Sequence, residues 1–99
     1  MISLTEQGKK HQPLAQIDGE NIVITIGREI THPMQEVHLI ECVDILMYTK
    51  AGLLRVKNFE LKHTDEPKIT FPVSDLKSGT YKVQTKCNLH GTWYDDFVI

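Results

Sequence analysis

The sequence has little cysteine, no long apolar run and little excess charge of either sign. Only two of its 99 residues are cysteine, Cys42 and Cys87. That is too few for a secreted disulfide scaffold, so we expect two free thiols rather than one bridge. The longest apolar runs, such as residues 22–26, are far shorter than the roughly 20 residues that a membrane helix needs. There are 11 Lys and Arg against 13 Asp and Glu, a net charge of -2, so no general attraction to nucleic acid or anionic lipid is expected.

The first residues also lack the apolar core of a secretory signal. We therefore expect a soluble, cytoplasmic protein with neither nucleic acid nor membrane as a partner. The chain is 40% hydrophobic and 24% charged, a composition that argues against disorder or a collagen-like repeat. Because about 100 residues bury one core but not two, residues 1–99 are expected to form a single domain.

Apolar and polar residues alternate from Asn21 onward, and helical spacing never persists for three turns. Ile22, Ile24 and Ile26 would share one face of the first strand, which Gly27 ends. Further strands are expected at Val37–Tyr48, Leu53–Leu61, Lys68–Val73 (an edge strand, because of Pro72), Tyr81–Cys87 and Trp93–Ile99. Six or seven short strands with turns about every ten residues predict an all-β sandwich of two sheets.

Residues 1–20 differ from the rest because they are polar, weakly patterned and punctuated by Gly and Pro. They are expected to form an extended arm or loop. Pro13 biases Gln12 towards extended geometry, so His11 would lie on irregular backbone near the surface.

The chain has five histidines, and their neighbours are informative. His38 begins a predicted strand, close to a loop that holds His32. Pleat counting along that strand puts three further residues on the face of His38: Ile40, Cys42 and Asp44.

A second cluster follows the predicted strand Tyr81–Cys87, on which Cys87 is in phase with the core face. His90 comes three residues later, and Gly91 permits the tight backbone that would let a thiolate and an imidazole converge on one ion. A Cys-x-x-His pair is weak evidence by itself. A buried thiol beside a surface imidazole at a strand end explains it equally well.

Three segments together resemble a known family. HPMQEVHLIE, followed by CNLHGTW, resembles the iron site of superoxide reductase, as found in neelaredoxin and in the C-terminal domain of desulfoferrodoxin. KKHQP near the start resembles the Glu-Lys-His-x-Pro segment of that family. The resemblance extends from His11 to Trp93 and implies an immunoglobulin-like β-sandwich, which agrees with the alternation.

The resemblance implies one mononuclear non-haem iron, held by four equatorial imidazoles and one axial thiolate. Carried over by position, the ligands would be His11, His32, His38, His90 and Cys87. Neutral imidazole suits ferrous iron, and a single thiolate adds electron density along one axis. Five protein ligands would leave one octahedral position free for a small oxidant.

Lys10 matches a family lysine that is implied to attract superoxide and to help place a proton source. Without the resemblance, Lys10 would be interpreted as a solvated surface lysine. The family often has a glutamate immediately before this lysine, which can close the sixth position in the ferric state. Here that residue is Lys9. We therefore expect the ferric site to be open or to carry water or hydroxide.

Three other residues are given structural interpretations. Cys42 stands where the family commonly has an aromatic residue, and is expected to be an inert core thiol rather than a metal ligand. His63 has only polar or charged neighbours and is expected at the surface near a turn. Trp93 is expected to pack against the loop that carries Cys87 and His90.

The resemblance implies an oxidoreductase of the single-iron type that reduces superoxide to hydrogen peroxide. No cysteine-rich iron domain precedes the predicted sandwich, so an external, rubredoxin-like electron donor is expected, and relatives suggest a homodimer or homotetramer. A cupredoxin-like electron carrier and a structural-zinc module are the alternatives. Blue-copper sites usually have a methionine soon after the last histidine, whereas the methionines here are Met1, Met34 and Met47.

Overall fold

The computed structural model describes residues 12–27, 34–35 and 37–99. The described chain forms seven strands and one short 3₁₀ helix: β1 (Pro13–Asp18), β2 (Asn21–Ile26), β3 (Ile40–Thr49), β4 (Gly52–Glu60), β5 (Lys68–Pro72), η1 (Val73–Asp75), β6 (Thr80–Cys87) and β7 (Gly91–Val98). None of the described helical residues belongs to a helix long and apolar enough to cross a membrane. The expectations for Lys9, Lys10, His11 and His32 lie outside the described residues.

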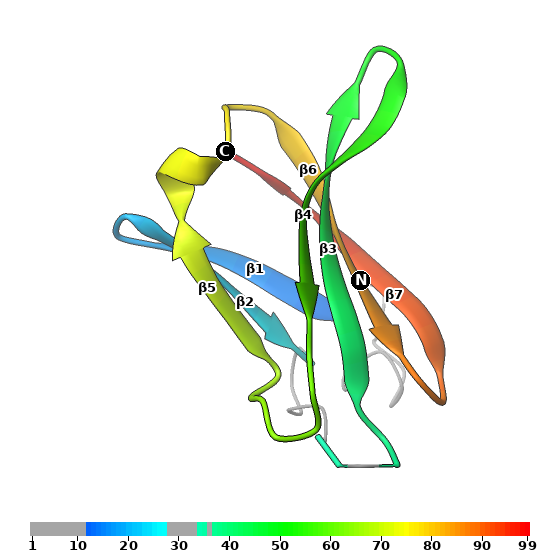
Figure 1. Ribbon diagram of the computed structural model, residues 1–99. Helices are drawn as coiled ribbons and strands as arrows, with labels where there is room; N and C mark the ends of the chain where they lie inside the picture. The colour runs from blue at the N-terminus through cyan, green and yellow to red at the C-terminus, as the bar shows by residue number, and fades with distance from the viewer. Residues whose placement is uncertain (1–11, 28–33, 36) are drawn as a thin grey trace, which may run out of the picture.

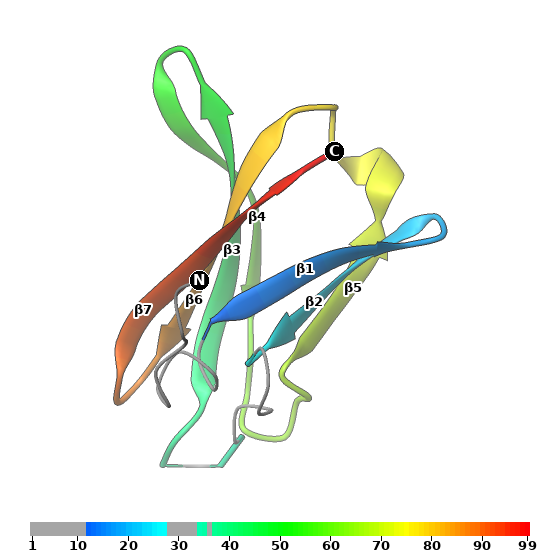
Figure 2. The ribbon, with the colours of Figure 1, turned by 180° about the vertical axis from the view of Figure 1, so that it is seen from behind.

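The strands form two antiparallel sheets that face each other (Figures 1 and 2). One sheet has the order β1-β2-β5 and the other the order β4-β3-β6-β7. In constant-type immunoglobulin domains the fourth strand joins the sheet of the first two, whereas here it pairs with β3. The predicted all-β, immunoglobulin-like sandwich of about seven strands is confirmed, and so is the edge position of β5.

The start of the described chain differs from the prediction. Residues 13–18, which were expected to belong to an irregular arm, pair with β2 along their whole length. Half of β1 is exposed and only Pro13 is fully buried, so the strand has no alternation of buried and exposed residues to reveal it. Proline is tolerated there because it is the first residue of an edge strand.

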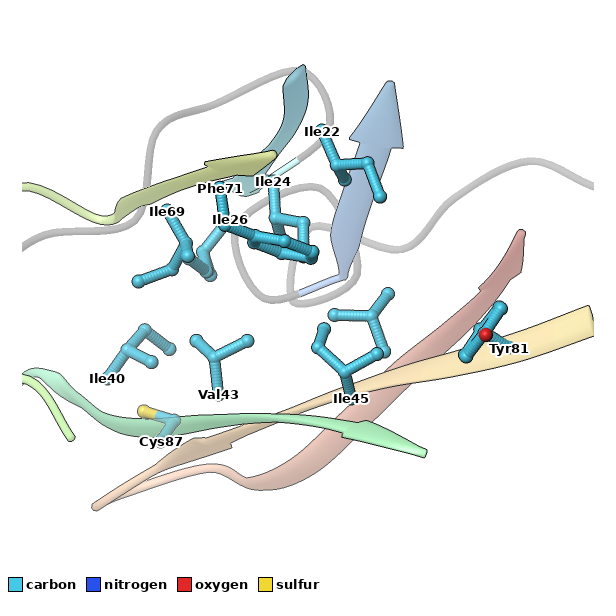
Figure 3. Close-up of a cluster of buried hydrophobic side chains, with 11 residues drawn as sticks. Ile22, Ile24, Ile26, Ile40, Val43, Ile45, Ile69, Phe71, Tyr81 and Cys87 are labelled. Carbon is cyan, nitrogen blue, oxygen red and sulfur yellow. The ribbon is translucent and has the colours of Figure 1, made fainter. Parts of the chain in front are cut away.

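The core consists of side chains from both sheets, and the face predicted for Ile22, Ile24 and Ile26 is buried as expected. Figure 3 shows these isoleucines, with side chains from β5, opposite the buried residues of β3 and β6. Cys87 lies at one end of this row and Tyr81 at the other (Figure 3). The core therefore reaches the end of β6, where the chemically active residues begin.

A bulge in β3 changes which residues face the core. Ile40 pairs with Cys87, but Cys42 pairs with Lys86, so Glu41 is one residue extra on the β3 side. After the bulge the fully buried positions are Val43 and Ile45 rather than Cys42 and Asp44. The predicted common face of Ile40, Cys42 and Asp44 is therefore wrong, because a single inserted residue inverts the alternation beyond it.

Tyr81 is buried and its hydroxyl donates a 2.6 Å hydrogen bond to the carbonyl oxygen of Lys77, four residues earlier. Its ring stacks on Phe97 with 5.4 Å between centroids. A tyrosine bonded back to the preceding connection is the tyrosine corner of many immunoglobulin-like sandwiches. Here it fastens the connection between η1 and β6.

We expect Tyr81→Phe to lower the free energy of unfolding by about 1–2 kcal/mol, because it removes one buried hydrogen bond and leaves the ring stacking intact. Urea denaturation followed by circular dichroism measures this change. Tyr48→Phe is the matched control, since the Tyr48 hydroxyl bonds Asp96 at 2.8 Å on an exposed surface. Equal losses in the two variants would contradict the role given to Tyr81.

Candidate metal centre

The end of β6 and the chain before β3 bring three potential metal ligands together. One ligand atom each from His38, Cys87 and His90 lie within 4.8 Å of one another. The Cys87 Sγ is 3.8 Å from the His90 Nδ1. The rings of His38 and His90 meet edge to face, with 5.0 Å between centroids and an interplanar angle of 76°. Both segments lie at the same end of the sandwich (Figures 1 and 2).

Burial differs sharply among the three residues. Cys87 is only 2% exposed, and it faces the core as the alternation of β6 predicted. His38 is half-buried, with its Nε2 inaccessible to solvent, whereas His90 is exposed. The cluster therefore runs from a protected sulfur inside the sandwich to an imidazole at its surface.

The turn between β6 and β7 fixes the positions of Cys87 and His90. Cys87 pairs with Gly91, which closes the turn. Gly91 has a φ of 80°, in the left-handed region that glycine adopts without strain. The indole Nε1 of Trp93 donates a 3.1 Å hydrogen bond to the His90 carbonyl oxygen. The expected contact of Trp93 with this loop is thus confirmed.

The backbone on each side of His38 is also held. His38 and Gln35 exchange two backbone hydrogen bonds, at 2.8 and 3.1 Å. The side chain of Asn88 bonds the backbone of both Val37 and Leu39. Sequence reasoning missed Asn88, although its place between two potential ligands and the known tendency of asparagine to bond backbone groups pointed to it.

The three donors fit a transition metal. Bonds of about 2.1 Å to nitrogen and 2.3 Å to sulfur allow at most about 4.4 Å between two ligands of one ion. Small side-chain rotations would bring the described donors within that limit. One thiolate with imidazoles suits iron, copper or zinc rather than calcium or magnesium.

Gln12 and Gly27, which flank the segments that contain His11 and His32, lie close to each other. Gln12, which follows His11, accepts a 3.1 Å hydrogen bond from the Gly27 backbone N–H through its own carbonyl. Gly27 precedes the segment that contains His32. The Gln12 side-chain amide also donates to the Tyr94 carbonyl oxygen at 3.4 Å, on β7 just beyond the turn that carries His90.

Cys42 does not lie beneath this cluster. It pairs with Lys86 and Glu60, and Lys86 points out of the sandwich, so the Cys42 thiol is on the outer face of the sheet. The interpretation of Cys42 as a core thiol is therefore wrong, and the bulge at Glu41 is the reason. Both cysteines are free thiols, as predicted. Partial burial and then the nearby carboxylate of Asp44 raise the pKa of the Cys42 thiol.

His63 lies exposed in the turn after β4, as predicted. It takes no part in the described cluster. Four of the five histidines therefore remain as candidates for the centre, two of them at described positions.

Comparison with known proteins assigns the chain to a family. The family model described as Desulfoferrodoxin matches residues 3–96. This chain belongs to the desulfoferrodoxin family. A desulfoferrodoxin homologue of Archaeoglobus fulgidus is 33% identical over 93 residues, which are 93% of this chain and 67% of that protein. A desulfoferrodoxin of Syntrophotalea carbinolica is 33% identical over 86% of this chain, which spans 60% of that protein.

Solved structures of the family have the same fold. The superoxide reductase (1Fe-SOR) from Giardia intestinalis superposes with a TM-score of 0.78 at 28% identity. The match covers 92% of this chain and 99% of that one. The match therefore takes in nearly the whole of that superoxide reductase.

The raised pKa of Cys42 predicts slow alkylation at neutral pH. A higher pKa leaves less thiolate, and the thiolate is the nucleophile. In Cys87→Ser, which has one thiol, iodoacetamide should modify native Cys42 more slowly at pH 8 than it modifies the chain unfolded in urea. The native rate should continue to rise with pH beyond the ordinary value of 9.0. Intact-mass spectrometry measures the rate of alkylation. A rate that levels off below pH 9.0 would contradict this prediction.

Proposed function

We propose that this chain is a superoxide reductase of the single-iron type. The observation that carries the proposal is the meeting of Cys87, His90 and His38 at one end of a family-typical sandwich. A relative of nearly the same extent in structure is described as a superoxide reductase with one iron. The proposed reaction converts superoxide, one electron and two protons into hydrogen peroxide.

The residues that would hold the iron are His11, His32, His38, His90 and Cys87. The described trio supplies three of the five. Two contacts of Gln12 support His11 and His32 as the other two ligands. Gln12 follows His11, and it bonds Gly27, at the end of the strand that leads towards His32. It also bonds Tyr94 on β7.

When bound there, ferrous iron would supply the electron that superoxide takes up and would become ferric, to be reduced again by an external, rubredoxin-like donor. Cys87 contributes a thiolate that the core shields from water and from direct oxidation, since only 2% of the residue is exposed. The Trp93 indole holds the backbone of His90, which keeps that imidazole oriented although it is exposed.

Lys10 is proposed to bring the anionic substrate to the site and to stabilise the negative charge that develops on its oxygens. Lys9, where relatives often have glutamate, would add a second positive charge to the approach. The rubredoxin-like donor, the homo-oligomeric state and the cytoplasmic location remain predictions.

Metal analysis tests the proposal directly. Protein isolated from its natural source should contain about one iron per chain and, after oxidation, show a visible absorption from the thiolate bonded to ferric iron. Cys87→Ser should lose this absorption entirely, because it removes the only proposed sulfur ligand.

Cys42→Ser is the matched control, since its sulfur lies on the outer face of the same sheet, and it should keep both the iron and the absorption. Stoichiometric zinc or copper in place of iron, with no iron-supported reduction of superoxide, would overturn the proposal in favour of a zinc module or a copper electron carrier.

Lys10→Ala should slow the bimolecular reaction with superoxide by about two- to tenfold and weaken its dependence on ionic strength, because it removes a steering charge. Pulse radiolysis at several salt concentrations measures the rate, and iron content should not change. Lys50→Ala removes the same charge from the β3–β4 turn, at the far end of the sandwich (Figure 1), and should have little effect. Equal effects of the two variants would contradict a local role for Lys10.

A further inference from the structure

Asn88 connects the two segments that carry the described donors. Its Oδ1 accepts a 3.0 Å hydrogen bond from the Leu39 backbone N–H, and its Nδ2 donates a 2.9 Å bond to the Val37 carbonyl oxygen. Its own backbone N–H donates to the Leu39 carbonyl oxygen at 3.2 Å. Three hydrogen bonds thus surround His38, although Asn88 is about 50 positions away in sequence.

The Asn88 side chain makes hydrogen bonds to the backbone that a neighbouring strand would otherwise make. The regular pairing of β3 with β6 ends at Ile40 and Cys87, next to the bulge. A carboxamide carries an acceptor and a donor, like a peptide group, so it adds two hydrogen bonds to the chain before β3 beyond the last paired residues. His38 lies between the two residues that this carboxamide bonds.

Other backbone hydrogen bonds hold His38 itself. The backbone N–H and C=O of His38 itself are bonded to Gln35, and those bonds leave the flanking groups of Val37 and Leu39 to Asn88. Without the carboxamide, the backbone on both sides of His38 would keep only one described hydrogen bond to the Cys87–His90 turn, the bond from the Asn88 backbone N–H to Leu39.

We infer that Asn88 is a positioning residue that holds the His38 imidazole in place for a metal ion shared with Cys87 and His90. The inference rests on the proposed metal site and deepens it. Asn88 acts through His38 and not on the substrate, because its carboxamide bonds the backbone on both sides of His38. Groups that orient metal ligands commonly change metal affinity by about ten- to a hundredfold when they are removed.

The test is a double-mutant cycle with Co²⁺ as the probe, followed by its visible absorption. Asn88→Ala should bind Co²⁺ about ten- to a hundredfold more weakly than the wild type, with an unchanged circular dichroism spectrum. In a His38→Ala background the same substitution should cost almost nothing, since the residue that it positions is gone. A loss of affinity that persists in full without His38 would overturn the inference, as would unchanged affinity in the single variant.

Asn58→Ala is the matched control. Asn58 is also exposed and its carboxamide bonds the Asp44 carboxylate at 2.6 Å, but on the outer face of the sheet. It should leave Co²⁺ affinity unchanged. Equal weakening by Asn58→Ala would mean that general destabilisation, not positioning, explains the result.

Asn88→Asp is a second variant, for use if Asn88→Ala fails to fold. It keeps the side-chain shape and the acceptor for the Leu39 N–H, and it loses the donor to the Val37 carbonyl oxygen. A carboxylate near a cation would by itself strengthen binding, so weaker Co²⁺ binding in Asn88→Asp supports the inference in spite of that added attraction. If the wild type bound neither Co²⁺ nor Fe²⁺, the proposed function and this inference would both fall. Wild-type binding with no effect of Asn88 would overturn the inference alone.

Discussion

β3 and β6 pair at the centre of the four-stranded sheet, and the last rung of that ladder joins Ile40 to Cys87. The candidate centre depends on this pairing, because it carries the chain before β3 to the turn after β6. Non-local strand pairing has a high entropic cost, which the buried residues of both strands offset by joining the core. The donors are therefore positioned by the most deeply buried part of the molecule.

The centre combines a rigid interior with an open exterior. Cys87 is the last core residue of β6, and the turn that carries His90 follows it directly. The burial that stabilises the sheet therefore also protects the sulfur of Cys87. His90, three residues later, is exposed. A sulfur inside and an imidazole outside would give a bound ion one shielded side and one accessible side, which agrees with the proposed reaction with a small anion.

Several features were predictable because they depend on local pattern. The alternation in β2 and β6 identified the strands and the faces that they bury, and Pro72 marked an edge strand. Two other features were not predictable from pattern. β1 is a half-exposed edge strand without a regular buried face. The bulge at Glu41 shifts the phase of β3 by one residue, which moved Cys42 from the expected core to the outer face.

The amino-acid sequence alone determined the all-β class, the family and the set of residue types that would hold a metal, since these follow from alternation and from short motifs. Tertiary structure alone decided which of those residues meet and what holds them. Asn88 illustrates the difference: in the sequence it is one polar residue in a turn, but in the folded chain its carboxamide spans two segments about 50 residues apart. Such a contact depends on the register of β3 against β6, and register arises from packing of the whole sandwich rather than from any local run of residues.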